Sequence, residues 1–124
     1  MLYAILAYHE EDRIASMTSE QNAGLMDRLM GAHDRINTRS TLGPAARLDF
    51  TAKAVTLRGS AEAMVTDGPF AETKEQLLGL YLLECSSLDD AVEAARELRR
   101  VNTTAVYEIR PILTYLPGEA VAEG

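Results

Sequence analysis

Two short segments are strongly apolar at both odd and even positions, and they restrict the fold more than any other feature of the sequence. They run from Leu2 to Tyr8 and from Leu77 to Cys85. Neighbouring side chains of a strand point to opposite faces, so a strand that is apolar at both parities is buried on both faces. We therefore predict two central strands in a sheet that needs a cover on each face.

Helical spacing follows the first of these strands and also the second. Thr18 and Gln21 have the spacing of a capping box, and the apolar residues behind them predict a helix over residues 19–37. Ser87 is placed to cap a second helix. Further short strands are predicted over residues 54–58, 63–66 and 105–112.

These elements predict a ferredoxin-like α+β fold, β-α-β-β-α-β with an extra hairpin. Residues 9–17 are expected to form a loop and residues 71–76 a single helical turn. Residues 1–116 would form one domain, with residues 117–124 as a flexible tail. Two helices can cover only one sheet face, so we expect a second copy of the chain to cover the other face in a homodimer.

Composition argues against several classes of partner. The chain has 19 acidic and 12 basic residues, a net charge of −7, which repels nucleic acid and anionic membranes. The first apolar run is far shorter than the roughly 20 residues of a spanning helix, and it lacks the flanks of a signal peptide. A single cysteine, Cys85, allows no internal disulfide and no thiolate zinc centre. We expect a cytoplasmic protein without a metal or cofactor.

Residues 67–77 read Asp-Gly-Pro-Phe-Ala-Glu-Thr-Lys-Glu-Gln-Leu, and this segment resembles the DGPF branch of the YCII-related family. The strand and helix after it, and both terminal strands, fit the same pattern, so the resemblance covers nearly the whole chain. It implies a dimeric ferredoxin-like α/β barrel with a small pocket near the subunit interface. It also implies a link to extracytoplasmic-function sigma factors, beside which such proteins are encoded in many bacteria.

The resemblance does not settle whether the chain is an enzyme. Some YCII relatives carry a His–Asp pair proposed as an acid–base dyad, and one relative acts in the breakdown of a chlorinated aromatic. This chain has Gly24 and Leu25 where the His belongs, and residues 100–103 are Arg-Val-Asn-Thr where the Asp belongs. The dyad therefore does not transfer to this chain.

The candidate ligand-binding residues are charged residues of two strands and of residues 67–77, called the motif segment below. A helical turn would bring Glu72 and Glu75 to one side beside Lys74, which would make a carboxylate pair with a shifted pKa; otherwise these charges only solvate a loop. Glu108 and Arg110 share a face of the last strand, where they would form an ion pair at the dimer interface or bind an anion. The full set is His9, Asp67, Glu72, Lys74, Glu75, Glu108 and Arg110.

Both histidines have two interpretations. His9 ends the first strand and either points into a pocket or is solvated. His33 lies on the apolar stripe of the first helix, which favours a partly buried histidine bonded to a neighbour over a functional one. Cys85 is expected to be a small buried hydrophobe. In the motif segment, Gly68 is expected to have a positive φ and Phe70 to fill the core beneath the turn.

Three functions stay open at this point. The leading hypothesis is a ligand-binding or accessory protein with a small-molecule pocket. The alternative is an acid–base enzyme, a lyase or dehalogenase acting on a small organic substrate, with Glu72 or His9 as the base. The third is a purely structural partner of another protein. A well-formed pocket would favour the first two.

Overall fold

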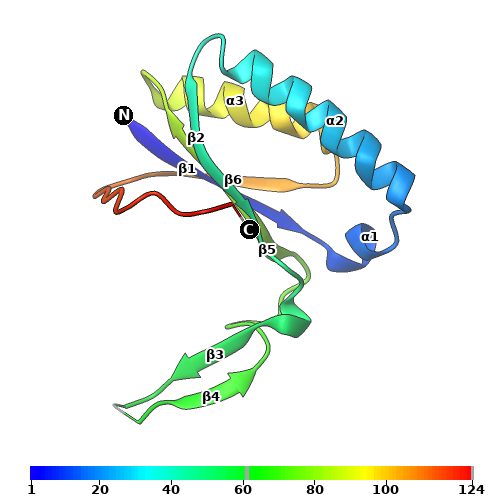
Figure 1. Ribbon diagram of the computed structural model, residues 1–124, viewed down its shortest axis with the longest axis vertical. Helices are drawn as coiled ribbons and strands as arrows, with labels where there is room; N and C mark the ends of the chain where they lie inside the picture. Colours follow the sequence, from blue (N-terminus) through cyan, green and yellow to red (C-terminus); the bar gives the residue numbers. More distant parts are fainter. Residues whose placement is uncertain (61, 124) are drawn as a thin grey trace.

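The computed structural model describes residues 1–60 and 62–123 and has a mixed α+β architecture (Figure 1). Six strands, three α-helices and one 3-10 turn follow one another in these residues. They are β1 (Leu2–His9), α1 (Glu11–Ala15), α2 (Ser19–Ile36), β2 (Thr41–Arg47), η1 (Thr51–Lys53), β3 (Val55–Arg58), β4 (Met64–Asp67), β5 (Gln76–Glu84), α3 (Leu88–Val101) and β6 (Val106–Pro111).

Four strands form the main sheet in the order β2-β5-β1-β6, and every neighbouring pair is antiparallel. The predicted apolar strands β1 and β5 are the two central ones. α2 lies between β1 and β2 in the chain, and α3 lies between β5 and β6, so each crossover skips one strand of the sheet. This is the ferredoxin-like arrangement, and the predicted fold class is confirmed.

Both long helices begin where the sequence predicts, and they cover the same face of the sheet (Figure 1). The Thr18 hydroxyl accepts a hydrogen bond from the Gln21 N–H at 3.1 Å, and the Gln21 side chain accepts one from the Thr18 N–H at 2.9 Å. The capping box is therefore complete. The Ser87 hydroxyl accepts from the Asp90 N–H at 3.2 Å and caps α3. Within the described residues, no helix is both long and apolar enough to span a membrane.

The core lies between these helices and the sheet. Ile5, Leu83 and Leu98 are fully buried there, and Cys85 is buried as predicted. The opposite sheet face carries the even-numbered residues of β1 together with Leu80 and Leu82 of β5, where Ala4 lies beside Leu82; these side chains are only partly buried. Within one copy of the chain, the two central strands are thus covered by helices on one face only.

Three segments differ from the prediction. β2 was not predicted, because Gly43 and Pro44 within it are poor strand formers. The strand tolerates them at the edge of the sheet, where its register with β5 is irregular between Leu42 and Ala45. Residues 9–17 contain the short helix α1 instead of a continuous loop. Residues 71–75 form no helical turn, and Gln76 already belongs to β5.

The predicted hairpin is present, but β3 and β4 form a separate sheet that extends away from the main one (Figure 1). Glu11 anchors its base, because its carboxylate accepts hydrogen bonds from the hydroxyl of Thr51 and, at 2.8 Å, from its N–H. After β4, Gly68 has the predicted positive φ, 101°. Phe70 does not fill the core: its segment lies at the projecting hairpin, where the ring is 77% exposed and packs against Arg58.

Candidate functional site

A cavity of about 220 Å³ lies between α2 and the helix-covered face of the sheet. Side chains of α2 line one side of it, and residues of β1, β2 and β5 line the other. Most of the lining is apolar. The polar side chains of the lining are those of His9, His33, Arg47, Tyr81, Asn102 and Tyr107. An apolar cavity with a few convergent polar groups is typical of small-molecule sites.

His9 is the most deeply placed polar residue of the cavity. It is the last residue of β1, and it is 7% exposed, which makes it the one buried polar residue in the described part of the chain. Its Nδ1 atom is buried and has no hydrogen-bond partner among the described residues. Burying a polar atom without a partner costs free energy, so a buried atom of this kind calls for a partner such as a ligand or an ordered water.

Arg47 lies at the rim of the same cavity, at the end of β2. Its register partner on β5 is Gly79, where a Cβ atom would lie 3.2 Å from the backbone oxygen of Ala46. The Arg47 Nη1 atom donates a long hydrogen bond of 3.4 Å to the Asn22 side chain on α2. Burial lowers the pKa of His9 below its usual value, and the positive charge of Arg47 lowers it further.

His33 and Tyr81 form a second polar pair in the lining of the cavity. The Nε2 atom of His33 and the Tyr81 hydroxyl share a hydrogen bond of 3.1 Å, and the two rings meet edge to face with centroids 5.3 Å apart. Burial lowers the pKa of His33 and raises the pKa of Tyr81. Burial also raises the pKa of Tyr107 to about 12.

These shifts define what the cavity can do chemically. Near pH 7 both imidazoles are neutral and both phenols keep their protons, so the cavity offers hydrogen-bond donors and acceptors without a negative charge. A neutral histidine can accept a proton from a bound molecule. Arg47 supplies the positive charge of the lining. The arrangement suits binding of a mostly apolar molecule with one polar group.

The histidine pKa values predict how stability depends on pH. The folded-state pKa of His9 and of His33 lies below the ordinary value of 6.5, so the unfolded chain binds more protons in this range. The free energy of unfolding should therefore be highest above about pH 6.5 and fall as the pH drops toward about 5. Three carboxylates, Glu10, Asp49 and Glu97, have lowered pKa values, and their protonation reduces the free energy of unfolding only at lower pH than the histidines do.

Urea unfolding between pH 7.5 and pH 5 measures this effect. Replacing either histidine by glutamine should flatten the profile, because each glutamine variant removes one of the two groups that take up a proton on unfolding. A free energy of unfolding that stays constant from pH 7 to pH 5 in the parent would contradict the burial of neutral histidines.

The residues predicted from the sequence do not gather at one place. His9 lines the cavity, whereas the four predicted residues of the motif segment do not. Glu75 lines a second, more open cleft together with Tyr8 and Leu77, between the main sheet and the base of the hairpin. Asp67 and Glu72 are exposed. The expected cluster does not form, because residues 71–75 are not helical.

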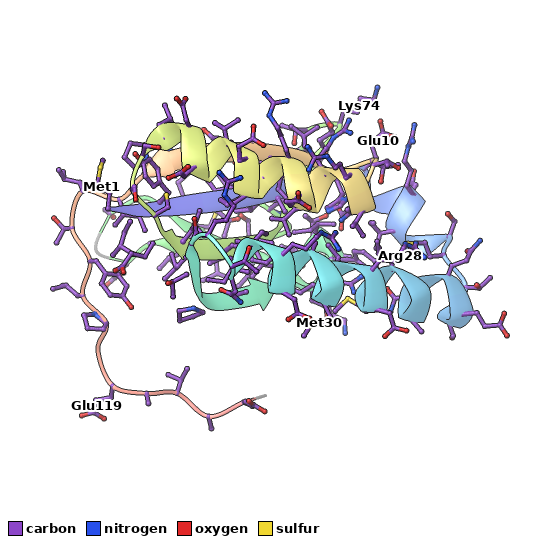
Figure 2. The ribbon with its side chains drawn as sticks, turned by 90° about the horizontal axis from the view of Figure 1, so that it is seen from above. Met1, Glu10, Arg28, Met30, Lys74 and Glu119 are labelled. Atoms are coloured by element: carbon purple, nitrogen blue, oxygen red, sulfur yellow. The ribbon has the colours of Figure 1, made fainter. Side chains whose placement is uncertain are left out.

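Lys74 pairs with Glu10 instead of with its neighbours in the motif segment. The distance from Nζ to Oε1 is 3.5 Å, and the lysine side chain is 81% exposed (Figure 2). Exposed pairs of this kind contribute little to stability. The pair joins the motif segment to the residue that follows β1.

Glu108 and Arg110 lie on the sheet face that the helices leave open. Their neighbours Tyr107 and Ile109 pack against the core on the other face. Glu108 accepts a hydrogen bond of 3.0 Å from the hydroxyl of Tyr8. The two charged residues are therefore separated from the cavity by the thickness of the sheet.

Sequence reasoning missed most of the polar residues of the cavity. The alternation of β5 and β6 was a usable signal for Tyr81 and Tyr107, since each lies on the same face as a core residue two positions away, Leu83 and Ile109 respectively. For His33, the apolar stripe of α2 pointed to a bonded, partly buried histidine, and the structure has that bond. No comparable signal existed for Arg47, because its strand was not predicted.

Comparison with known proteins shows which family the chain belongs to. The YCII-related domain matches residues 1–115. The chain is also similar to an uncharacterised protein of Rhizobium meliloti (strain 1021), with 48% identity over 121 residues that cover 96% of this chain and 98% of that protein. Among the described residues, no group of three His, Cys, Asp or Glu side chains is arranged to hold a metal ion.

Proposed function

We propose that this chain, which belongs to the YCII-related domain family, binds a small organic molecule in the cavity between α2 and the sheet. The observation that carries the proposal is His9, a buried imidazole whose Nδ1 has no partner among the described residues and which lines an apolar cavity. A ligand that hydrogen-bonds to this ring would remove the cost of the unpartnered atom. The His33–Tyr81 pair supplies further polar contacts.

The second cleft, beside the motif segment, is the weaker candidate. Its charged residues include Asp49 and Lys53, which pair with each other at 3.4 Å, and Glu75. The cleft is also open to solvent on the side of the projecting hairpin, where Phe70 is exposed. Water would compete there for every polar contact, whereas His9 is buried, so a ligand bonded to it would meet less competition from water.

A small-molecule thermal-shift screen on the parent and on a cavity-filling variant tests the proposal. Ala45 lines the cavity and is exposed, so Ala45→Leu should narrow the cavity without overpacking the core. Compounds that raise the melting temperature of the parent should lose most of their effect on this variant. Ala52→Leu is the matched control, because Ala52 is exposed in η1 and does not line the cavity. Hits that stabilise the parent and both variants equally would contradict the proposal.

An acid–base enzyme is the second candidate, and the lowered pKa of His9 favours it. A histidine that is neutral near pH 7 and lines a cavity is able to act as a general base. Glu72, the other residue proposed as base, is exposed and lies outside the cavity lining. Turnover of a bound compound that is lost in His9→Gln, while the compound still binds, would distinguish the enzyme from a binding protein.

A homodimer through the open sheet face completes the proposal. Partly exposed Leu80 and Leu82 lie on this face, and leaving such apolar surface in water is unfavourable by about 25 cal/mol per Å². Glu108 and Arg110 stand on the same face of β6, so a two-fold axis would let each charge meet its opposite on a second copy. The link to extracytoplasmic-function sigma factors stays a prediction that rests on the family resemblance alone.

A further inference from the structure

We propose that the molecule bound in the cavity is a small organic anion, a monocarboxylate or a similar acid with an apolar body, and that Arg47 binds its charged group. This inference rests on the proposed binding function and specifies its ligand.

The cavity lining differs in charge from the chain as a whole. The chain carries 19 acidic and 12 basic residues. The described residues that line the cavity include Arg47 and no aspartate or glutamate. With both histidines neutral, the lining therefore has a net positive charge. In a chain with a net charge of −7, a cavity of this sign favours an anion over a cation or a neutral compound.

Arg47 is available to bind an anion. Four arginines, Arg13, Arg35, Arg96 and Arg100, pair with glutamates, whereas no ion pair within the described residues includes Arg47. Among the described residues, its side chain donates one hydrogen bond, to Asn22 at 3.4 Å, which is long and weak. The guanidinium has five N–H donors in a planar fork that matches a carboxylate. Most of these donors are left for a ligand at the rim of the cavity.

The rest of the lining determines the other end of the ligand. Behind Arg47, the buried side chains Ala7, Leu29 and Leu78 are apolar. The cavity, at about 220 Å³, is smaller than the roughly 300–1,000 Å³ of typical ligand pockets. The ligand is therefore a compact molecule, such as a monocyclic or short-chain acid. Its body would lie among the apolar side chains, with its acid group toward Arg47 and within reach of His9.

Titrations of matched acid–amide pairs, followed by the chemical shifts of backbone amides, test the inference. The probes are benzoate with benzamide, phenylacetate with phenylacetamide, and hexanoate with hexanamide, since each pair differs in charge and hardly in shape. At least one acid should bind more tightly than its amide and shift signals of cavity residues. Arg47→Met should raise the dissociation constant of that acid by about tenfold or more, because a charge-assisted hydrogen bond is lost. The dissociation constant of the amide should not change.

Arg39→Met is the charge-matched control. It removes the same charge from an exposed residue just before β2, whereas Arg47 ends that strand, so acid binding should not change beyond a small effect of net charge. If no acid is preferred over its amide, or if both variants weaken it equally, the anion proposal is overturned. The wider binding function fails separately, when no compound of any charge distinguishes the parent from Ala45→Leu.

Discussion

Leu98→Ala is expected to lower the free energy of unfolding by roughly 2–5 kcal/mol, whereas Phe70→Ala should cost about 1 kcal/mol or less. Leu98 is fully buried where α3 packs on the sheet, so its truncation leaves a cavity in the core. Phe70 is 77% exposed, and its ring contacts the Arg58 guanidinium at 5.0 Å from the centroid. An exposed cation–π contact contributes little to stability.

Urea denaturation of the parent and both variants at one protein concentration measures the difference. The contrast matters because the sequence alone favours a buried Phe70, for which the two losses would be similar. Equal losses for the two variants would mean that the motif segment packs on the core in solution, with Phe70 buried.

Leu82→Asp is expected to dissociate the proposed homodimer while leaving the subunit folded. Leu82 lies on the open sheet face, so its replacement adds a charge at the proposed contact and not in the core. Burying that charge should raise the dissociation constant by about 30-fold or more. Tyr81, its neighbour, lies on the helix-covered face and contacts His33, so Tyr81→Asp should instead impair folding.

Sedimentation at micromolar concentration, together with circular dichroism, separates these outcomes. The parent should sediment as a dimer and Leu82→Asp as a folded monomer. Leu57→Asp is the control, because Leu57 is an exposed apolar residue of the hairpin and does not belong to the open face of the main sheet. A parent that sediments only as a monomer would end the dimer proposal.

The sequence predicts most of the fold, because its signals are local. Thr18, Gln21 and Ser87 satisfy the first N–H groups of their helices through contacts three residues away, so the caps can be recognised without a structure. β2 cannot be recognised in this way: Gly43 and Pro44 argue against a strand, and it forms because β5 offers an unpaired edge. Its existence depends on residues more than 30 positions away.

The site was less predictable than the fold, for the same reason. His9 could be placed at a strand end, but the cavity that it lines is completed by residues of α2 and β2, which only the tertiary fold brings to it. The cavity joins His33 on α2 to Tyr81 on β5, two residues that only the tertiary fold brings together. In the sequence, the cluster of charged residues in the motif segment resembles a binding site. An exposed loop that is only solvated carries a similar cluster, so the sequence does not distinguish the two.

Chemical-shift mapping of the strongest hit from the small-molecule screen tests the central claim most directly. If the ligand occupies the cavity, backbone amide signals of His9, His33, Arg47 and Tyr81 should shift together and saturate with one dissociation constant. The signals of residues 67–75 and of the open sheet face should change little. Saturable shifts confined to the motif segment, or to Glu108 and Arg110, with His9 and His33 unaffected, would contradict the account and place the binding site outside the cavity.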